Sequence, residues 1–96
     1  MQNPVALIVD DERDIRDLLS TALSRMGLDV VSAESIQQAK LLLGENRFDI
    51  CLTDMRLGDG SGIDLISYVS EHYANMPIAM ITAYGDVQSA VNALKA

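Results

Sequence analysis

The sequence predicts a doubly wound α/β domain built on a parallel β-sheet. Apolar runs of strand length alternate with segments in which apolar residues recur every three or four positions, the helical period. The first run, Val5–Val9, is apolar at every position, as expected for a strand that is buried on both faces. The resulting order βαβαβαβα implies right-handed crossovers, and therefore a parallel sheet with helices on both faces.

The first half of the chain contains two predicted strand–helix units. The first strand is followed by a helix that Gly27 is expected to end as its C′ residue. The second strand is Leu28–Val31, placed near an edge of the sheet because Asp29 interrupts it. Ser35 is the predicted N-cap of a second helix that ends at Gly44. The expected core positions of the two helices are Ile15, Leu18, Leu19, Ala22, Leu23, Met26, Ile36, Ala39, Leu42 and Leu43.

The second half repeats the pattern. Phe48–Leu52 is the third predicted strand, and a glycine-rich loop over residues 56–62 follows it. Ser61 is the expected N-cap of a third helix, Ile78–Ile81 is the fourth strand, and a last helix begins at about Asp86. The expected core positions of these helices are Ile63, Ile66, Val69, Tyr73, Val87, Val91 and Leu94.

Composition excludes several classes of function. The 96 residues are enough for one small domain, and a net charge of −7 argues against nucleic-acid binding, which needs clustered Lys and Arg. Cys51 is the only cysteine, so no internal disulfide can form. The sequence has no secretory signal and no apolar stretch near the length of about 18 residues that a membrane helix needs. A cytoplasmic protein without a membrane partner is therefore expected.

Polar side chains follow three of the predicted strands. Asp10 and Asp11 come after the first strand, Asp54 after the third and Thr82 after the fourth. Ligands of open α/β sheets bind at the carboxyl ends of the strands, and neighbouring strands lie about 4.8 Å apart. Carboxylates gathered there repel one another unless a cation intervenes, and Mg²⁺ is the hard, oxygen-seeking ion that suits them.

This constellation favours phosphoryl chemistry. A bound Mg²⁺ neutralises charge on an incoming phosphoryl group, and a carboxylate such as Asp54 can act as the nucleophile and form an aspartyl phosphate. Thr82 is then expected to donate a hydrogen bond to a phosphoryl oxygen. The competing interpretation is that acids after strands are ordinary helix caps and solvated loop residues.

Four motifs resemble the receiver domains of two-component response regulators. They are Val9-Asp10-Asp11-Glu12, Leu52-Thr53-Asp54-Met55-Arg56-Leu57, Asp59-Gly60-Ser61-Gly62 and Met80-Ile81-Thr82-Ala83. The resemblance covers the whole chain and implies a flavodoxin-like fold with strand order 2-1-3-4. It is closest to the N-terminal receivers of nitrogen-regulator-class activators of sigma-54 promoters, and within that class the chain is similar to regulators of type IV pilus expression.

The resemblance implies a role for each site residue. Asp11 and Asp54 would bind Mg²⁺ directly, Asp10 would bind it chiefly through water, and Arg56 would contribute its backbone carbonyl. Asp54 would accept a phosphoryl group from a phosphohistidine of a sensor histidine kinase.

Two further positions complete the implied switch. The backbone N–H groups of Arg56 and Ala83 would face the phosphoryl oxygens. Thr82 would move toward the phosphorylated site and signal to output domains outside this chain, expected to be an AAA+ domain and a DNA-binding domain. The chain would thus act as a phosphoacceptor that assists its own phosphorylation, and not as a turnover enzyme.

The chain departs from the family pattern in two places. Gly58 stands where these receivers usually carry proline, which is expected to leave the loop more mobile. The family's lysine and switch aromatic lie on a fifth strand, expected beyond Ala96, and Lys95 is not that lysine. Residues 1–96 are therefore expected to be a truncated receiver, with slow or absent phosphotransfer and self-association through the bare edge of the sheet.

A second class of function competes with the receiver. Phosphatases of the haloacid dehalogenase type also use an aspartate after a strand of a parallel sheet, but they carry a second aspartate two residues later. Arg56 occupies that position here. The enzyme interpretation is therefore disfavoured, and sustained hydrolysis of p-nitrophenyl phosphate would favour it.

Overall fold

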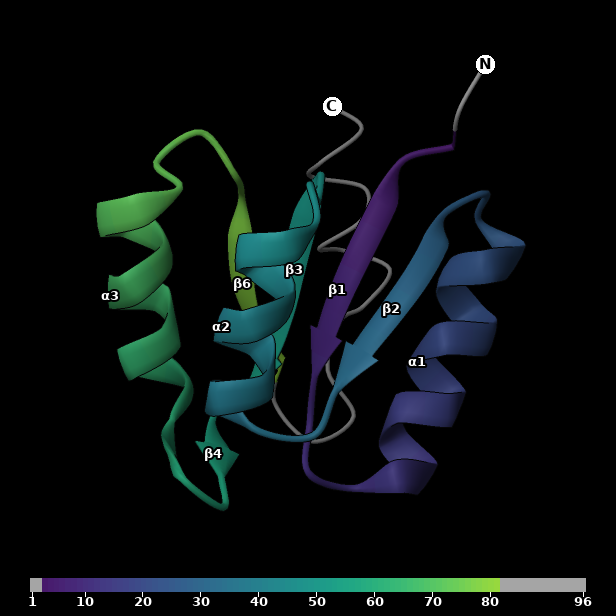
Figure 1. Ribbon diagram of the computed structural model, residues 1–96. Coiled ribbons are helices and arrows are strands. Elements are labelled where there is room, and N and C mark those ends of the chain that lie inside the picture. Colours follow the sequence, from purple (N-terminus) through teal and green to yellow (C-terminus); the bar gives the residue numbers. More distant parts are fainter. Residues whose placement is uncertain (1–2, 82–96) are drawn as a thin grey trace.

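Four parallel strands form the central sheet, in the order β2-β1-β3-β6 (Figure 1). The computed structural model describes residues 3–81. The strands are β1 (Val5–Val9), β2 (Asp29–Ala33), β3 (Ile50–Asp54) and β6 (Ile78–Ile81). Since β6 is the fourth strand of this sheet along the chain, the order confirms the predicted 2-1-3-4, with β2 at an edge. The second and third strands begin one and two residues later than predicted.

Helices cover both faces of the sheet. Helix α1 (Arg13–Arg25) packs on one face, and α2 (Ile36–Glu45) and α3 (Gly62–His72) pack on the other (Figure 1). This is the doubly wound arrangement that the alternating pattern predicted. The predicted helix from Asp86 lies outside the described residues.

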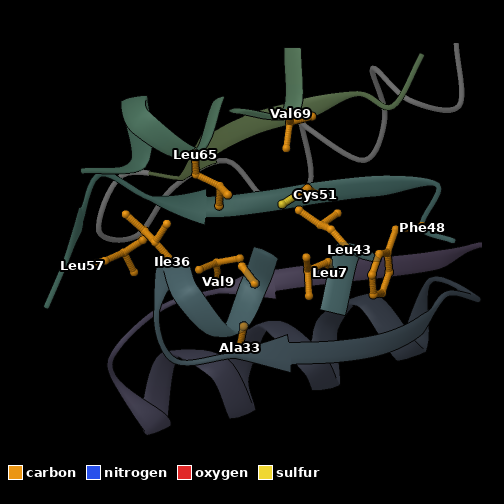
Figure 2. Close-up of a cluster of buried hydrophobic side chains, with 11 residues drawn as sticks. Leu7, Val9, Ala33, Ile36, Leu43, Phe48, Cys51, Leu57, Leu65 and Val69 are labelled. Atoms are coloured by element: carbon orange, nitrogen blue, oxygen red, sulfur yellow. The ribbon is translucent and has the colours of Figure 1, made fainter. Parts of the chain in front are cut away.

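The side chains of β1 alternate between two hydrophobic cores. Leu7 and Val9 point into the core under α2 and α3, whereas Ala6 and Ile8 point into the core under α1. All four side chains are at most 1% exposed, which confirms the prediction of a strand buried on both faces. The core under α2 and α3, shown in Figure 2, contains Leu7, Val9, Ala33, Ile36, Ala39, Leu43, Phe48, Cys51, Leu57, Leu65 and Val69.

One of the two predicted helix ends was right and one was wrong. Gly27 has φ 91° and follows the C-cap Met26, so it adopts the left-handed conformation expected of a C′ glycine. Gly44 does not end α2, which continues to Glu45. The helix ends instead at Asn46, whose backbone N–H and side-chain amide both donate to the carbonyl of Leu42, at 2.9 and 3.1 Å.

Two predicted core residues lie on the surface. Leu18 is 62% exposed and Ile63 is 59% exposed. The buried face of α1 passes through Leu19 and Leu23, and that of α3 passes through Leu65 and Val69. In each case the sequence offers apolar residues one or two positions apart, and the docking of the helix decides which of them enters the core.

The glycine-rich loop after β3 contains a small ribbon that was not predicted. Strands β4 (Arg56–Leu57) and β5 (Gly60–Ser61) pair in antiparallel fashion. Leu57 is only 8% exposed and belongs to the core beside Ile36 (Figure 2). The side chain of Leu57 in β4 therefore anchors the loop to the core.

The end of this loop begins α3 as predicted. Ser61 Oγ accepts the backbone N–H of Ile63 at 3.1 Å, and Asp64 Oδ2 accepts the backbone N–H of Ser61 at 3.3 Å. The two bonds form a capping box, which fixes the first turn of the helix.

Candidate functional site

Three carboxylates converge at the carboxyl edge of the sheet. Asp10 and Asp11 follow β1, and Asp54 is the last residue of the adjacent strand β3. One carboxylate oxygen from each residue lies within 4.8 Å of the others. An octahedral Mg²⁺ with ligands at 2.0–2.1 Å places opposite ligands about 4.2 Å apart. Neighbouring ligands of the same ion lie about 2.9 Å apart. The three acids are therefore close enough to share one cation once their side chains turn toward it.

The chemistry of the donor set also fits a cation. All three donors are anionic oxygens, and among residues 3–81 the one ion pair joins Arg13 to Asp17 on α1 and includes none of these acids. Arg16 lies nearby, but its Nη1 donates to the backbone carbonyl of Asp10, at 2.8 Å, and not to a carboxylate. Within the described part of the chain, the negative charge of the cluster is thus not neutralised by a side chain.

Asp10 experiences this charge most strongly because it is buried. Its side chain is 6% exposed, and burial is the main reason that its pKa is raised above the ordinary value of 3.8. The backbone N–H of Glu12, which donates to Asp10 Oδ1 at 2.9 Å, opposes the increase in pKa. The charges of Asp54 and Asp11 add to it. A bound divalent cation would offset the repulsion among the three carboxylates and stabilise the ionised form of Asp10.

The backbone also orients Asp54. Its Oδ1 accepts the backbone N–H of Met55 at 2.8 Å, and its own carbonyl accepts the hydroxyl of the buried Thr53 at 3.0 Å. The side chain is half-buried, so Oδ2 remains available to an incoming group.

The other predicted site residues are described only in part. Arg56 begins β4, its side chain is exposed, and its backbone is held by pairing with Ser61. Thr82 and Ala83 lie outside the described residues, so the structure does not test the roles given to them.

Two residues that follow Asp54 make contacts that the sequence did not reveal. Asp59 binds the start of α2 through both carboxylate oxygens. Gly62 packs so closely against the backbone of Asp54 that a Cβ there would collide with the Asp54 carbonyl. Both residues belong to a motif that was noted in the sequence, but their partners are distant in the chain, so no local spacing pointed to these contacts.

Two other candidate nucleophiles have no part in this site. Cys51 is fully buried in β3, and burial raises the pKa of its thiol to about 12. His72 is exposed on α3, where its ring lies 4.4 Å from the ring of Tyr68, measured between centroids.

A cavity of about 430 Å³ lies at the opposite end of the sheet. Residues of the loops that precede β3 and β6, among them Arg47, Phe48 and Tyr73, line it together with residues of α2 and α3. None of the three clustered acids contributes to its wall. The cavity is therefore separate from the acidic edge of the sheet.

Replacing Asp10 with asparagine is expected to stabilise the metal-free chain at neutral pH. Because the pKa of Asp10 is raised on folding, the folded chain binds a proton more readily than the unfolded chain does. The contribution of Asp10 to wild-type stability should therefore fall as the pH rises from the unfolded pKa near 3.8 through the higher folded pKa. Asparagine stays neutral, so the advantage of Asp10→Asn should be small in acid, grow across this window and remain constant above it.

Urea unfolding at a series of pH values, in the presence of a chelator, measures this difference. Added Mg²⁺ should then stabilise the wild type more than the variant. Parallel stability curves for the two proteins across the acid range would contradict the assignment of Asp10 as the buried, strained member of the cluster.

The chain is similar to known proteins over nearly its whole length. Residues 6–96 match the family described as the response regulator receiver domain. The chain is 54% identical over 96 residues to the response regulator protein PilR of Pseudomonas aeruginosa, and it is 32% identical over 93 residues to the DNA-binding transcriptional regulator NtrC of Proteus hauseri. These matches cover 100% and 97% of the chain but only 22% and 20% of the relatives, so the chain spans about a fifth of their length.

A solved structure gives the same result for the fold. The response regulator TrrA of Thermotoga maritima, in complex with Mg²⁺ and BeF, superimposes with a TM-score of 0.81 and 27% sequence identity. The match covers 90% of this chain and 75% of the TrrA chain. Within residues 3–81, no helix has the length and apolar character that crossing a membrane requires.

Proposed function

The chain belongs to the response regulator receiver domain family, and from this premise we propose that it accepts a phosphoryl group at Asp54 with the help of Mg²⁺. The observation that carries the proposal is the convergence of Asp10 and Asp11 on Asp54 at the carboxyl edge of the sheet. A phosphatase of the haloacid dehalogenase type finds no support, because the family match extends over nearly the whole chain.

The residues of the site would bind Mg²⁺ in different ways. Asp11 and Asp54 would ligate Mg²⁺ directly, Asp10 would hold it through water, and the backbone carbonyl of Arg56 would complete the protein ligands. When bound, the cation neutralises charge on the phosphoryl oxygens, which is most of what this reaction requires.

Asp54 performs the covalent step. Its carboxylate oxygen attacks the phosphorus atom of a phosphohistidine on a sensor histidine kinase and forms a new P–O bond. The P–N bond breaks, and the imidazole nitrogen leaves with the electron pair. The hydrogen bond from the backbone N–H of Met55 to Asp54 Oδ1 keeps the other carboxylate oxygen directed at the incoming group.

The phosphorylated state would be sensed from the neighbouring strand. We assign Thr82, just beyond β6, as the hydroxyl that bonds a phosphoryl oxygen, and we assign the backbone N–H groups of Arg56 and Ala83 to the remaining oxygens. We propose that these groups form a switch that is set once per phosphorylation, and not an enzyme with sustained turnover.

The response would be delivered outside this chain. Relatives such as PilR and NtrC are several times longer, and NtrC is a DNA-binding transcriptional regulator. We propose that the receiver controls AAA+ and DNA-binding output domains in the cytoplasm, at sigma-54 promoters of type IV pilus genes. The net charge of −7 supports leaving nucleic-acid binding to those domains.

Labelling with acetyl phosphate tests the proposal. Because phosphotransfer by residues 1–96 is expected to be slow, the incubation should be long. The chain should then gain one phosphoryl group in intact-mass spectrometry, peptide mapping should locate it at Asp54, and a chelator should prevent it because the acids then have no cation. Labelling that is unaffected by the chelator, or located elsewhere, would contradict the proposal. Sustained hydrolysis of p-nitrophenyl phosphate would contradict the switch and favour an enzyme.

A further inference from the structure

Asp59 joins the loop that follows Asp54 to the amino end of α2. Its Oδ1 accepts the backbone N–H of Ile36 at 2.9 Å, and its Oδ2 accepts that of Gln37 at 3.0 Å. These partners lie 23 and 22 residues earlier in the chain. The two bonds therefore fasten the turn between β4 and β5 to a separate element of the fold.

The N–H groups that begin α2 are divided between two side chains. The helix's own N-cap, Ser35, accepts the N–H of Gln38 through its Oγ at 3.0 Å. Asp59 accepts the N–H groups of Ile36 and Gln37, the two helix residues before Gln38. These two bonds lower the pKa of Asp59 below its ordinary value of 3.8, so the carboxylate is ionised where the helix dipole favours negative charge. Ser35 already caps the helix locally. Asp59 adds something that Ser35 cannot supply, a connection between the helix and the loop.

That connection continues through the loop to the acids. Arg56 pairs with Ser61 and Leu57 pairs with Gly60, so a restraint on the turn restrains both strands of the ribbon. Leu57 is buried beside Ile36, the residue whose N–H Asp59 binds (Figure 2). Polar and apolar contacts thus hold the loop to the same end of α2.

The turn itself offers little restraint. Gly58 precedes Asp59, and a Cβ at that glycine would meet open space, so no packing fixes its backbone. Glycine also leaves the backbone dihedrals free. The carboxylate of Asp59 therefore supplies the polar restraint at the tip of the ribbon, beside the apolar contacts that Leu57 and Gly60 make with Ile36.

We propose that Asp59 is a positioning residue for the metal and phosphoryl site. Its carboxylate holds the ribbon on α2 and thereby keeps the Arg56 backbone in place beside Asp54. The inference rests on the proposed function, which assigns the Arg56 carbonyl to Mg²⁺. Residues that orient a metal ligand without touching the metal typically change its affinity by a factor of about 10 to 100.

Three variants test the proposal: Asp59→Ala, Asp59→Asn and Ser35→Ala. Ser35→Ala is the matched control, because it also removes a cap from α2 but leaves the loop attached. Mg²⁺ titration followed by the NMR signals of backbone amides should show the dissociation constant rising roughly 10-fold in Asp59→Ala and staying at the wild-type value in Ser35→Ala. Asp59→Asn retains one acceptor oxygen and should lie between Asp59→Ala and the wild type.

Amide hydrogen exchange supplies a second measurement that needs no metal. In Asp59→Ala the amides of Leu57 and Gly60 should exchange faster, whereas in Ser35→Ala they should exchange as in the wild type. If the wild type bound no Mg²⁺, the proposed function would fail, and the exchange data would still decide whether Asp59 holds the loop.

Two results would overturn the inference. The first is equal changes in Mg²⁺ affinity and in exchange for Asp59→Ala and Ser35→Ala, because Asp59 would then act only as a helix cap. The second is equal weakening in Asp59→Ala and Asp59→Asn, because the effect would then follow the lost charge and not the lost hydrogen bonds.

Discussion

Replacing Asp54 with asparagine should abolish phosphorylation by acetyl phosphate and leave the fold intact. The asparagine side chain cannot act as the nucleophile, because its amide lacks the carboxylate's negative charge and reactive oxygen. Its Oδ1 can still accept the backbone N–H of Met55, which is the contact that orients the native side chain. The variant also removes one charge from a cluster of three acids, so its free energy of unfolding should change by less than about 1 kcal/mol.

Intact-mass spectrometry and thermal unfolding of the same samples measure the two parts of this prediction. Asp17→Asn is the matched control, since it makes the same chemical change at an acid on α1 whose side chain is 72% exposed. The control should be phosphorylated like the wild type. A phosphoryl group on Asp54→Asn would show that another residue is the acceptor, and an unfolded variant would show that Asp54 has a structural role that its contacts do not reveal.

Features that depend on topology could be predicted well from the sequence. Val5–Val9 is apolar throughout and is indeed a strand between two cores. Once that strand is central, the rule that ligands meet the carboxyl ends of parallel strands brings Asp10 and Asp11 near Asp54 without any knowledge of coordinates. The acid cluster could therefore be predicted before its geometry was known.

Features that depend on packing between distant segments could not be predicted. The helical period cannot decide between neighbouring apolar residues such as Leu18 and Leu19, and only the docking of α1 buries Leu19 and exposes Leu18. Asp59 presents the same difficulty, because an acid in a glycine-rich loop reads as solvated until α2 is placed beside it. The missed residues are those whose partners are remote in the sequence.

Gly62 illustrates this point with a second large expected effect. It is the first residue of α3, its N–H donates to the carbonyl of Met55 at 2.8 Å, and a Cβ at this position would collide with the backbone carbonyl of Asp54. The neighbouring atoms belong to the backbone and cannot rotate away as a flexible side chain could. Gly62→Ala must therefore move either the start of α3 or the backbone that carries Asp54.

We expect Gly62→Ala to lower the free energy of unfolding by about 3 kcal/mol, the upper end of the usual cost of overpacking, and to slow phosphorylation of Asp54 even when the chain is fully folded. Gly44→Ala is the matched control, because Gly44 lies in α2 and a Cβ added there would meet open space. Alanine at this position should instead stabilise the chain by about 0.5–1 kcal/mol. Urea unfolding and the rate of acetyl phosphate labelling measure both effects. If Gly62→Ala kept wild-type stability and labelling, the close approach of α3 to β3 would not be what fixes Asp54. If Gly62→Ala lowered the free energy of unfolding while Gly44→Ala raised it, the contact with the Asp54 backbone would be the reason that position 62 needs glycine.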